Sequence, residues 1–117
     1  MAMSILIVDD DHDFGRAAAE LLADRGYRVL GQATTAAEAL ARCNELDPDA
    51  VLLDVRLPDG DGVALAGKLD RRGGRPRILL TSSDRKAVSP ERVRQSGANG
   101  FIPKAHLVCC DLDRFLR

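Results

Sequence analysis

The stretch Ile5–Asp11 reads ILIVDDD and places four apolar residues directly before three acidic ones. Apolar runs of Val, Ile and Leu without alternating polar residues are typical of strands that are buried on both faces. Three more such runs each lead to one polar side chain: 51–53 to Asp54, 78–80 to Thr81, and 101–102 to Lys104. The pattern predicts a parallel sheet with polar groups at the carboxyl ends of its strands.

Helical periodicity separates these runs. The first predicted helix follows the acidic residues, ends at Gly26, and has one apolar face made of Phe14, Ala17, Ala18, Leu21 and Leu22. Capping and breaking residues delimit two further helices. Thr35 and Glu38 form a capping box at the start of one, which ends before Pro48. Asp61 caps the other, which ends at the two glycines at 73–74.

The last two predicted helices differ in how firmly they attach to the core. Ser89 and Pro90 begin a short helix at 90–96, in which Val93 is the only large apolar residue. The final helix has a well-defined inward face, formed by Val108, Leu112, Phe115 and Leu116. We therefore expect the helix at 90–96 to be the weakly anchored one.

A strand at 28–33 completes an order in which strand and helix alternate five times. With right-handed crossovers, this order predicts a flavodoxin-like doubly wound α/β fold, a (βα)5 unit with a five-stranded parallel sheet of order 2-1-3-4-5. Residues 1–117 are interpreted as one domain. In such a sheet the ligand crevice lies at the carboxyl ends of the strands, so the polar groups are expected to converge there.

Composition narrows the function classes. The chain is 45% hydrophobic and 30% charged with a net charge of -1, which is typical of a globular domain and gives no general attraction to nucleic acid. No membrane-spanning or signal-type segment is evident, which favours a cytoplasmic protein. The cysteines, Cys43, Cys109 and Cys110, form no disulfide or C-x-x-C pattern and are interpreted as reduced thiols.

The converging acids suggest a chemistry. Asp9, Asp10 and Asp54 would repel one another without a cation, and Mg²⁺ suits a site that offers oxygen ligands and leaves positions for water and phosphate. Asp54 stands alone after its strand and is placed to act as a nucleophile toward phosphorus. Lys104 would neutralise charge on the transferring group, and the Thr81 hydroxyl would donate to a phosphoryl oxygen.

Four motifs carry a resemblance that covers essentially the whole chain. ILIVDDD at 5–11, LLDVRLPDGDG at 52–62, RILLTS at 77–82 and GANGFIPK at 97–104 resemble the receiver domain of bacterial two-component response regulators. The resemblance implies the following roles: Asp54 as phosphoacceptor, Asp9 and Asp10 as the Mg²⁺-binding acids, the backbone carbonyl of Arg56 as a further metal ligand, Thr81 and Phe101 as switch residues, and Lys104 as the family's lysine.

The resemblance also implies a function. A sensor histidine kinase or a phosphotransfer protein would supply the phosphoryl group, and the domain would be a switch with at most self-catalysed phosphorylation and dephosphorylation, not an enzyme. Phosphorylation would change the face made of the helix at 90–96, the strand at 101–102 and the helix at 108–116. This face would act on a downstream protein, on a C-terminal output domain or in a homodimer.

Two alternatives within the family stay open: the N-terminal receiver of a DNA-binding transcriptional regulator, and a pseudo-receiver that works without phosphorylation. A haloacid dehalogenase-like phosphatase would need an Asp where Arg56 stands, and a flavodoxin would need a phosphate loop where the acidic residues lie. Two positions depart from the common receiver pattern. Ala105 follows Lys104 in place of Pro, which argues against a cis peptide there, and Phe101 replaces the common Tyr.

Overall fold

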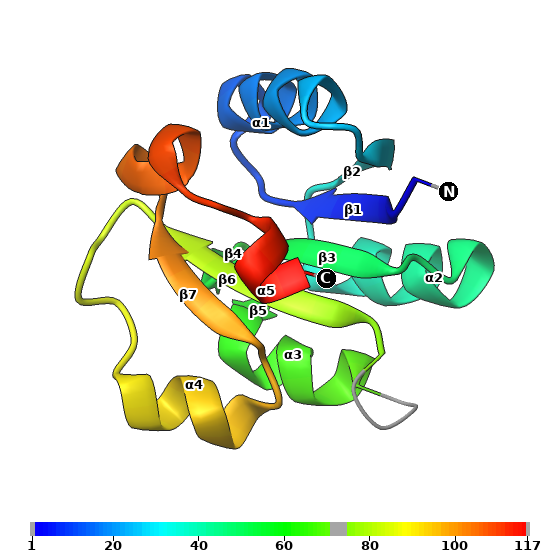
Figure 1. Cartoon of the computed structure of the whole chain (residues 1–117). Helices are drawn as coiled ribbons and strands as arrows, with labels where there is room; N and C mark the ends of the chain where they lie inside the picture. Colours follow the sequence, from blue (N-terminus) through cyan, green and yellow to red (C-terminus); the bar gives the residue numbers. More distant parts are fainter. Residues whose placement is uncertain (1, 71–74, 117) are drawn as a thin grey trace.

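The computed structural model describes residues 2–70 and 75–116, and they form a five-stranded sheet between two layers of helices (Figure 1). The sheet has the order β2-β1-β3-β6-β7, and all of its neighbouring strands are parallel. Its strands are β1 (Ser4–Val8), β2 (Arg28–Ala33), β3 (Ala50–Asp54), β6 (Arg77–Ser82) and β7 (Gly100–Pro103). The predicted fold class and the 2-1-3-4-5 order are confirmed.

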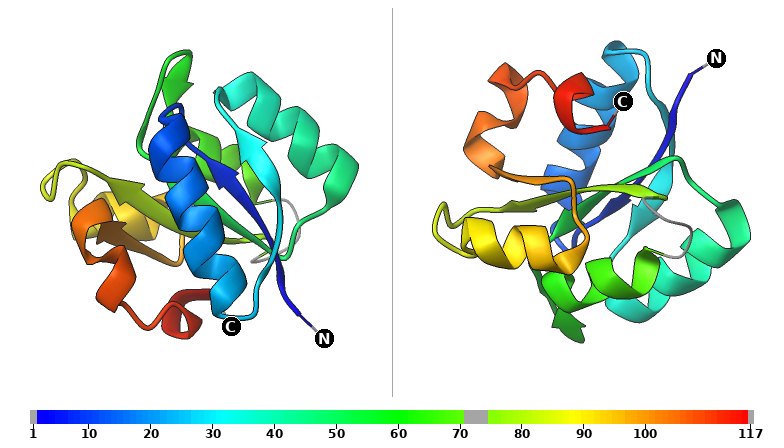
Figure 2. Two further views of the ribbon diagram at one scale, coloured as in Figure 1. Left: turned by 90° about the horizontal axis from the view of Figure 1, so that it is seen from above. Right: turned by 60° about the horizontal axis from the view of Figure 1, so that its bottom comes forward.

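Helices cover both faces of the sheet (Figure 2). On one face lie α1 (His12–Asp24), the 3₁₀ helix η1 (Lys104–Cys109) and α5 (Asp113–Leu116). On the other face lie α2 (Ala36–Leu46), α3 (Gly62–Leu69) and α4 (Pro90–Ser96). The strands β1, β3 and β6 are buried almost completely because helices pack on both of their sides, which explains their continuous apolar sequences.

Side-chain caps begin four of these helices. Asp11, Asp61 and Ser89 accept hydrogen bonds from the first backbone N–H groups of α1, α3 and α4, and the caps predicted at Asp61 and Ser89 are thereby confirmed. Thr35 accepts from the N–H of Glu38, whose carboxylate in turn accepts from the N–H of Thr34. The predicted capping pair is therefore present, with its return bond one residue before the cap.

The apolar face predicted for α1 is largely found, and so is the single apolar anchor predicted for α4. In α1, Ala18 and Leu22 are buried in the core between this helix and the sheet, and Phe14 and Leu21 are partly buried against the same core. Ala17 is exposed. In α4, Val93 is the buried residue, so this helix rests on the sheet through one large side chain. The terminator predicted at 73–74 lies outside the described residues, and α3 already ends at Leu69.

The final helix was predicted wrongly. Instead of one helix over 108–116, the structure has η1 and the four-residue α5, separated by an extended Cys110. Leu107 occupies the core position expected for Val108, which is 67% exposed. Two side chains explain the break: Arg25 donates to the carbonyls of Val108 and Cys110, and Asp111 accepts from the N–H of Asp113 to start α5.

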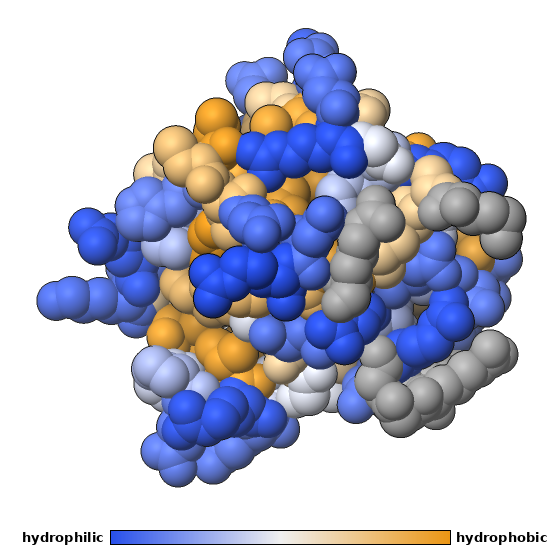
Figure 3. Space-filling view, viewed as in Figure 1, coloured by the Kyte–Doolittle hydropathy of each residue, from blue (hydrophilic) through white to orange (hydrophobic). Residues whose placement is uncertain are grey.

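Several smaller features complete the fold. A two-stranded antiparallel ribbon, β4 (Arg56–Leu57) with β5 (Gly60–Asp61), occupies the predicted loop after β3. Among the described residues, the cis peptide bond is the one that precedes Pro76, and the bond before Ala105 is not cis. Cys43, Cys109 and Cys110 are free thiols, as interpreted from the sequence. The view in Figure 3 presents mostly hydrophilic side chains, with hydrophobic areas showing between them.

Candidate functional site

The polar residues of the four motifs meet at the carboxyl edge of the sheet. Parallel pairing aligns β1 with β3, and β3 with β6, so that Asp54 stands directly opposite Thr81. Asp9 follows the last residue of β1 at the same edge, and Lys104 follows β7. The register of the parallel strands therefore brings together side chains that are far apart in the sequence.

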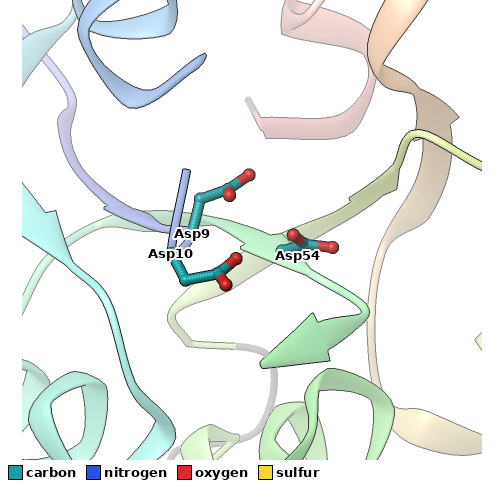
Figure 4. Close-up of side chains that lie close together, drawn as sticks. All are labelled: Asp9, Asp10 and Asp54. Atoms are coloured by element: carbon teal, nitrogen blue, oxygen red, sulfur yellow. The ribbon is translucent and has the colours of Figure 1, made fainter. Parts of the chain in front are cut away.

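Three carboxylates form the centre of the site (Figure 4). One ligand oxygen from each of Asp9, Asp10 and Asp54 lies within 4.8 Å of the others. Asp9 is 1% and Asp54 6% exposed, whereas Asp10 faces solvent. A set of carboxylate oxygens that is open on one side fits a hard divalent cation such as Mg²⁺, which keeps several waters and takes few direct protein ligands.

Lys104 supplies the positive charge beside these acids. Its Nζ lies 2.7 Å from Oδ2 of Asp9 and 3.4 Å from Oδ2 of Asp54, and its side chain is only 16% exposed. Burial by itself disfavours the charged ammonium, but hydrogen bonding to Asp9 and the charge of Asp54 outweigh it and raise the pKa of Lys104 above its usual value. The ammonium therefore stays charged at neutral pH.

Asp54 lies in a mixed environment. Burial is the main cause that raises the pKa of its carboxyl group above the usual value, and the negative charge of Asp9 acts in the same direction. The backbone N–H of Arg56, which donates to Oδ1 at 3.1 Å, and the ammonium of Lys104 oppose this shift. The Asp54 carboxylate is thus held in one orientation but is incompletely compensated.

Thr81 adds a hydroxyl group that has no hydrogen-bond partner among the described residues. Its Oγ1 is buried and is one of the few buried polar side-chain atoms in the described residues that lack a hydrogen-bond partner. Such a group is costly to bury without a partner, so an acceptor oxygen placed beside it would be stabilised by its hydrogen bond. An open pocket of about 420 Å³ lies at this edge, lined by residues that include Asp10, Asp54, Arg56, Ser82, Ser83 and Lys104.

Phe101, which the resemblance predicts to be a switch residue, lies on the side of the sheet that carries α4. Phe101 in β7 is half-buried and packs at the margin of the core. Together with Arg85, Val88, Pro90 and Val93 it lines a hollow of about 320 Å³. Nη2 of Arg56 lies 3.5 Å from Oδ2 of Asp84 at the mouth of the site. The guanidinium has no acceptor atom, so the backbone carbonyl is the candidate metal ligand of Arg56.

Three residues at the site were not found from the sequence. The ring of Phe14 lies 4.3 Å from Nζ of Lys104, a cation–π contact. Gly62 begins α3 so close to β3 that a Cβ there would come within 2.0 Å of the Asp54 carbonyl oxygen. Gln32 hydrogen-bonds the backbone of the acidic loop. The sequence indicates only a core position for Phe14. Nothing in the local sequence indicates the contacts that Phe14, Gly62 and Gln32 make at the site.

Residues 5–108 match the model of the response regulator receiver domain family. The chain belongs to this family. It therefore carries a receiver domain with an acidic pocket made of Asp9, Asp10 and Asp54, and receiver domains are phospho-accepting switches, not conventional enzymes. The resemblance drawn from the four motifs is confirmed.

Curated relatives of this receiver are longer regulators. It is 36% identical over 101 residues to the response regulator GacA of Pseudomonas viridiflava, covering 85% of this chain and 47% of the relative. It is likewise 36% identical over 103 residues to the DNA-binding transcriptional activator DevR/DosR of Mycobacterium tuberculosis, covering 87% and 48%. The chain thus spans about half the length of these relatives.

Solved receiver structures share the fold of this receiver. The signal receiver domain of a response regulator NarL from Mycobacterium tuberculosis aligns with a TM-score of 0.77 at 30% identity, covering 96% of this chain and 94% of that one. A LuxR-family response regulator from Aurantimonas aligns with a TM-score of 0.82 at 27% identity, covering 93% and 81%. Within 2–70 and 75–116, none of the receiver's helices combines the length and apolar character that a bilayer crossing requires.

Proposed function

We propose that this receiver is a phosphorylation-activated switch in which Asp54 accepts a phosphoryl group from a sensor histidine kinase or a phosphotransfer protein. The observation that carries the proposal is the convergence of three carboxylates, the Lys104 ammonium and the unpartnered Thr81 hydroxyl at one edge of the sheet. These groups match what phosphoryl transfer to a carboxylate requires, a nucleophile and positive charge for the phosphoryl oxygens.

The transfer itself is one displacement at phosphorus. A carboxylate oxygen of Asp54 forms the new P–O bond while the P–N bond to the donor imidazole breaks, and the nitrogen keeps the electron pair. The N–H of Arg56 holds the other oxygen, Oδ1, so that Oδ2 is the one left for attack. Lys104, already 3.4 Å from Oδ2, then neutralises a phosphoryl oxygen, and no proton has to leave Asp54 because it reacts as the carboxylate.

The acidic residues fit Mg²⁺, and we propose that Asp9, Asp10, Asp54 and the backbone carbonyl of Arg56 hold it. When bound, Mg²⁺ supplies positive charge for the phosphoryl oxygens and relieves the mutual repulsion of the acids. Asp9 and Asp54 are buried and oriented by the hydrogen bonds from Asp11 and Arg56, whereas Asp10 faces the solvent from which the ion enters.

The switch would operate through Thr81. A phosphoryl group on Asp54 offers acceptor oxygens beside the buried Thr81 hydroxyl, which has no partner before phosphorylation. Movement of Thr81 toward these oxygens would vacate space that Phe101 can fill, and the hollow between Phe101 and α4 would change with it. Because Val93 is the only buried residue of α4, displacing this helix should cost less than displacing a helix with a larger buried face.

We further propose that residues 1–117 form a single receiver domain whose output face comprises α4, β7 and α5. The relative named as a DNA-binding transcriptional activator favours an output through a DNA-binding domain, since the matched region is about half of that relative. A downstream protein or a homodimer through the same face are the other outputs. As for receivers in general, the proposed location is the cytoplasm.

Intact-mass spectrometry after incubation with Mg²⁺ and acetyl phosphate tests the proposal. We expect one phosphoryl adduct that is absent from Asp54→Ala and absent when EDTA removes the metal. Asp13→Ala is the matched control, because Asp13 is an exposed acid near the site that takes no part in the cluster. An adduct that persists in Asp54→Ala refutes the assignment. No adduct from either acetyl phosphate or phosphorylated kinase would favour a pseudo-receiver.

A further inference from the structure

Gln32 connects strand β2 to the loop that carries the acidic residues. Its Nε2 donates hydrogen bonds to the carbonyl oxygens of Asp9 at 3.0 Å and Asp11 at 3.2 Å. These two carbonyls flank Asp10, so the contacts restrain the backbone on both sides of that residue. Both acceptors are carbonyl oxygens, so only the NH₂ end of the amide can face them.

A bulge in β2 directs Gln32 toward this loop. The pairing of β1 with β2 runs from Ile5 opposite Val29 to Leu6 opposite Gly31, so that β2 contains one extra residue. As a consequence, Gln32 pairs with Ile7 and lies on the α1 side of the sheet. Without the extra residue, it would stand opposite Val8 and face the α2 side, because side chains alternate along a strand.

A glycine in α1 leaves room for the amide. A Cβ at Gly15 would come within 2.2 Å of Cδ and Nε2 of Gln32, so any larger residue must displace this side chain. Glycine in the middle of a helix is otherwise unfavourable compared with alanine. Gly31 adopts φ +151° in the bulge of β2, a conformation that favours glycine, and so allows the strand to place Gln32 on the α1 side. Two glycines that are unfavourable in regular elements thus serve the placement of one side chain.

We propose that Gln32 is a positioning residue for the metal-binding acids, an inference that rests on the proposed function. By bonding the carbonyls of Asp9 and Asp11, it holds the loop in the conformation that turns the carboxylates of Asp9 and Asp10 toward Asp54. The N–H of Asp11, which donates to Oδ1 of Asp9 at 2.9 Å, transmits this restraint to the buried carboxylate. Gln32 is not among the residues that line the pocket at the carboxyl edge, so it would act through the loop and not through contact with the ion.

Mg²⁺ titration followed by NMR tests this inference on two single variants and their double variant. Gln32→Met keeps the length of the side chain but removes both donors, and we expect the Kd for Mg²⁺ to rise about three- to tenfold. Gly15→Ala leaves Gln32 intact but displaces it, and the same loss is expected while Tm stays equal or rises, because alanine favours the helix. The double variant should bind no more weakly than the weaker single variant.

Gln95→Met and Gly67→Ala are the matched controls, since both positions are exposed on helices away from the loop, and both should bind Mg²⁺ like the wild type. Binding by Gln32→Met and Gly15→Ala within about twofold of the wild type would overturn the inference. A Kd of the double variant that is raised by the product of the two single effects would overturn the inference as well. If the wild type itself fails to bind Mg²⁺, the proposed metal site falls, and the role of Gln32 falls with it.

Discussion

Nζ of Lys104 lies 2.7 Å from Oδ2 of Asp9, although the two residues follow strands that are separated by β3 and β6 in the sheet. Before a cation or a phosphoryl group arrives, this ion pair and the weaker contact to Asp54 balance part of the negative charge of the pocket. Lys104 is therefore both the counter-ion of the resting site and the group we propose to neutralise the phosphoryl oxygens.

Replacement of Lys104 should separate these two roles. We expect Lys104→Ala to slow labelling by acetyl phosphate about tenfold or more, because a positive group at the transferring phosphoryl is lost. Mg²⁺ should bind as tightly as in the wild type or more tightly, since a competing cation has left Asp9. Mass spectrometry and Mg²⁺ titration measure the two effects, with the exposed Lys86→Ala as control. Equal losses in both would contradict the assignment.

The buried charge of Asp54 should make the metal-free protein less stable at neutral pH. Its folded pKa is raised, so the folded state binds a proton more readily than the unfolded one, and stability falls as pH rises above the usual Asp pKa of 3.8. Asp54→Asn removes the charge and should raise Tm in EDTA by about 2 to 5 °C at pH 7.

The advantage of Asp54→Asn should disappear at pH values below 3.8, where the carboxyl group is protonated in both states. Mg²⁺ should also reduce it, since the cation stabilises only the protein that retains Asp54. Thermal unfolding at both pH values, with and without Mg²⁺, measures these changes. A lower Tm of the variant in EDTA at pH 7 would show that the Lys104 contact outweighs the cost of burial.

Gly62 should tolerate no side chain. A Cβ there would meet the Asp54 carbonyl oxygen at 2.0 Å, and this atom belongs to a central strand that cannot move aside. We expect Gly62→Ala to lower the free energy of unfolding by about 2 kcal/mol or more, measured by urea denaturation. Gly67→Ala in the same helix is the control. Its nearest contact would be at 3.7 Å, so it should be neutral or stabilising.

Asp59 should stabilise the fold from outside the site. Its carboxylate accepts from the N–H groups of Ala36 at 2.6 Å and Ala37 at 3.1 Å, tying the β4–β5 ribbon to the start of α2. These bonds hold the pKa of Asp59 below 3.8, so its contribution is present above that pH and is lost as pH falls through the lower folded value.

The urea midpoint of Asp59→Ala should accordingly be lower than that of the wild type at pH 7, with the gap closing in acid. Asp59→Asn keeps one acceptor oxygen, so its urea midpoint at pH 7 should lie between those of Asp59→Ala and the wild type. The difference between the midpoints of Asp59→Asn and Asp59→Ala should change little with pH. A gap that is the same at pH 7 and in acid would mean that the charged carboxylate plays no part in capping α2.

The acidic cluster could be anticipated because it depends on strand ends. Once ILIVDDD and the run before Asp54 are interpreted as parallel strands, their carboxyl ends must lie at one edge. The exact contacts within the cluster could not be anticipated, since the partner of Lys104 depends on how β7 and its following 3₁₀ helix are placed. The same holds for Gln32, whose direction depends on a bulge that leaves no mark in the local pattern of apolar residues.

The error in the final helix has a similar origin. Apolar spacing at 108, 112, 115 and 116 is compatible with one helix, but Arg25 from another part of the chain binds the carbonyls of Val108 and Cys110. Long-range hydrogen bonds of this kind override local periodicity because they satisfy backbone groups that a helix would otherwise satisfy. Leu107 then fills the core in place of Val108.

The sequence by itself determined the five strands of the parallel sheet, most helix boundaries, the fold class and the residues at the carboxyl edge, because apolar runs, caps and breakers act locally. Only the tertiary structure decided the pairing of Lys104 with Asp9, the isolation of the Thr81 hydroxyl, the approach of Gly62 to Asp54 and the clamp by Gln32. Each of these is a contact between elements, whose geometry is set by packing and register and not by the residues on either side in the chain.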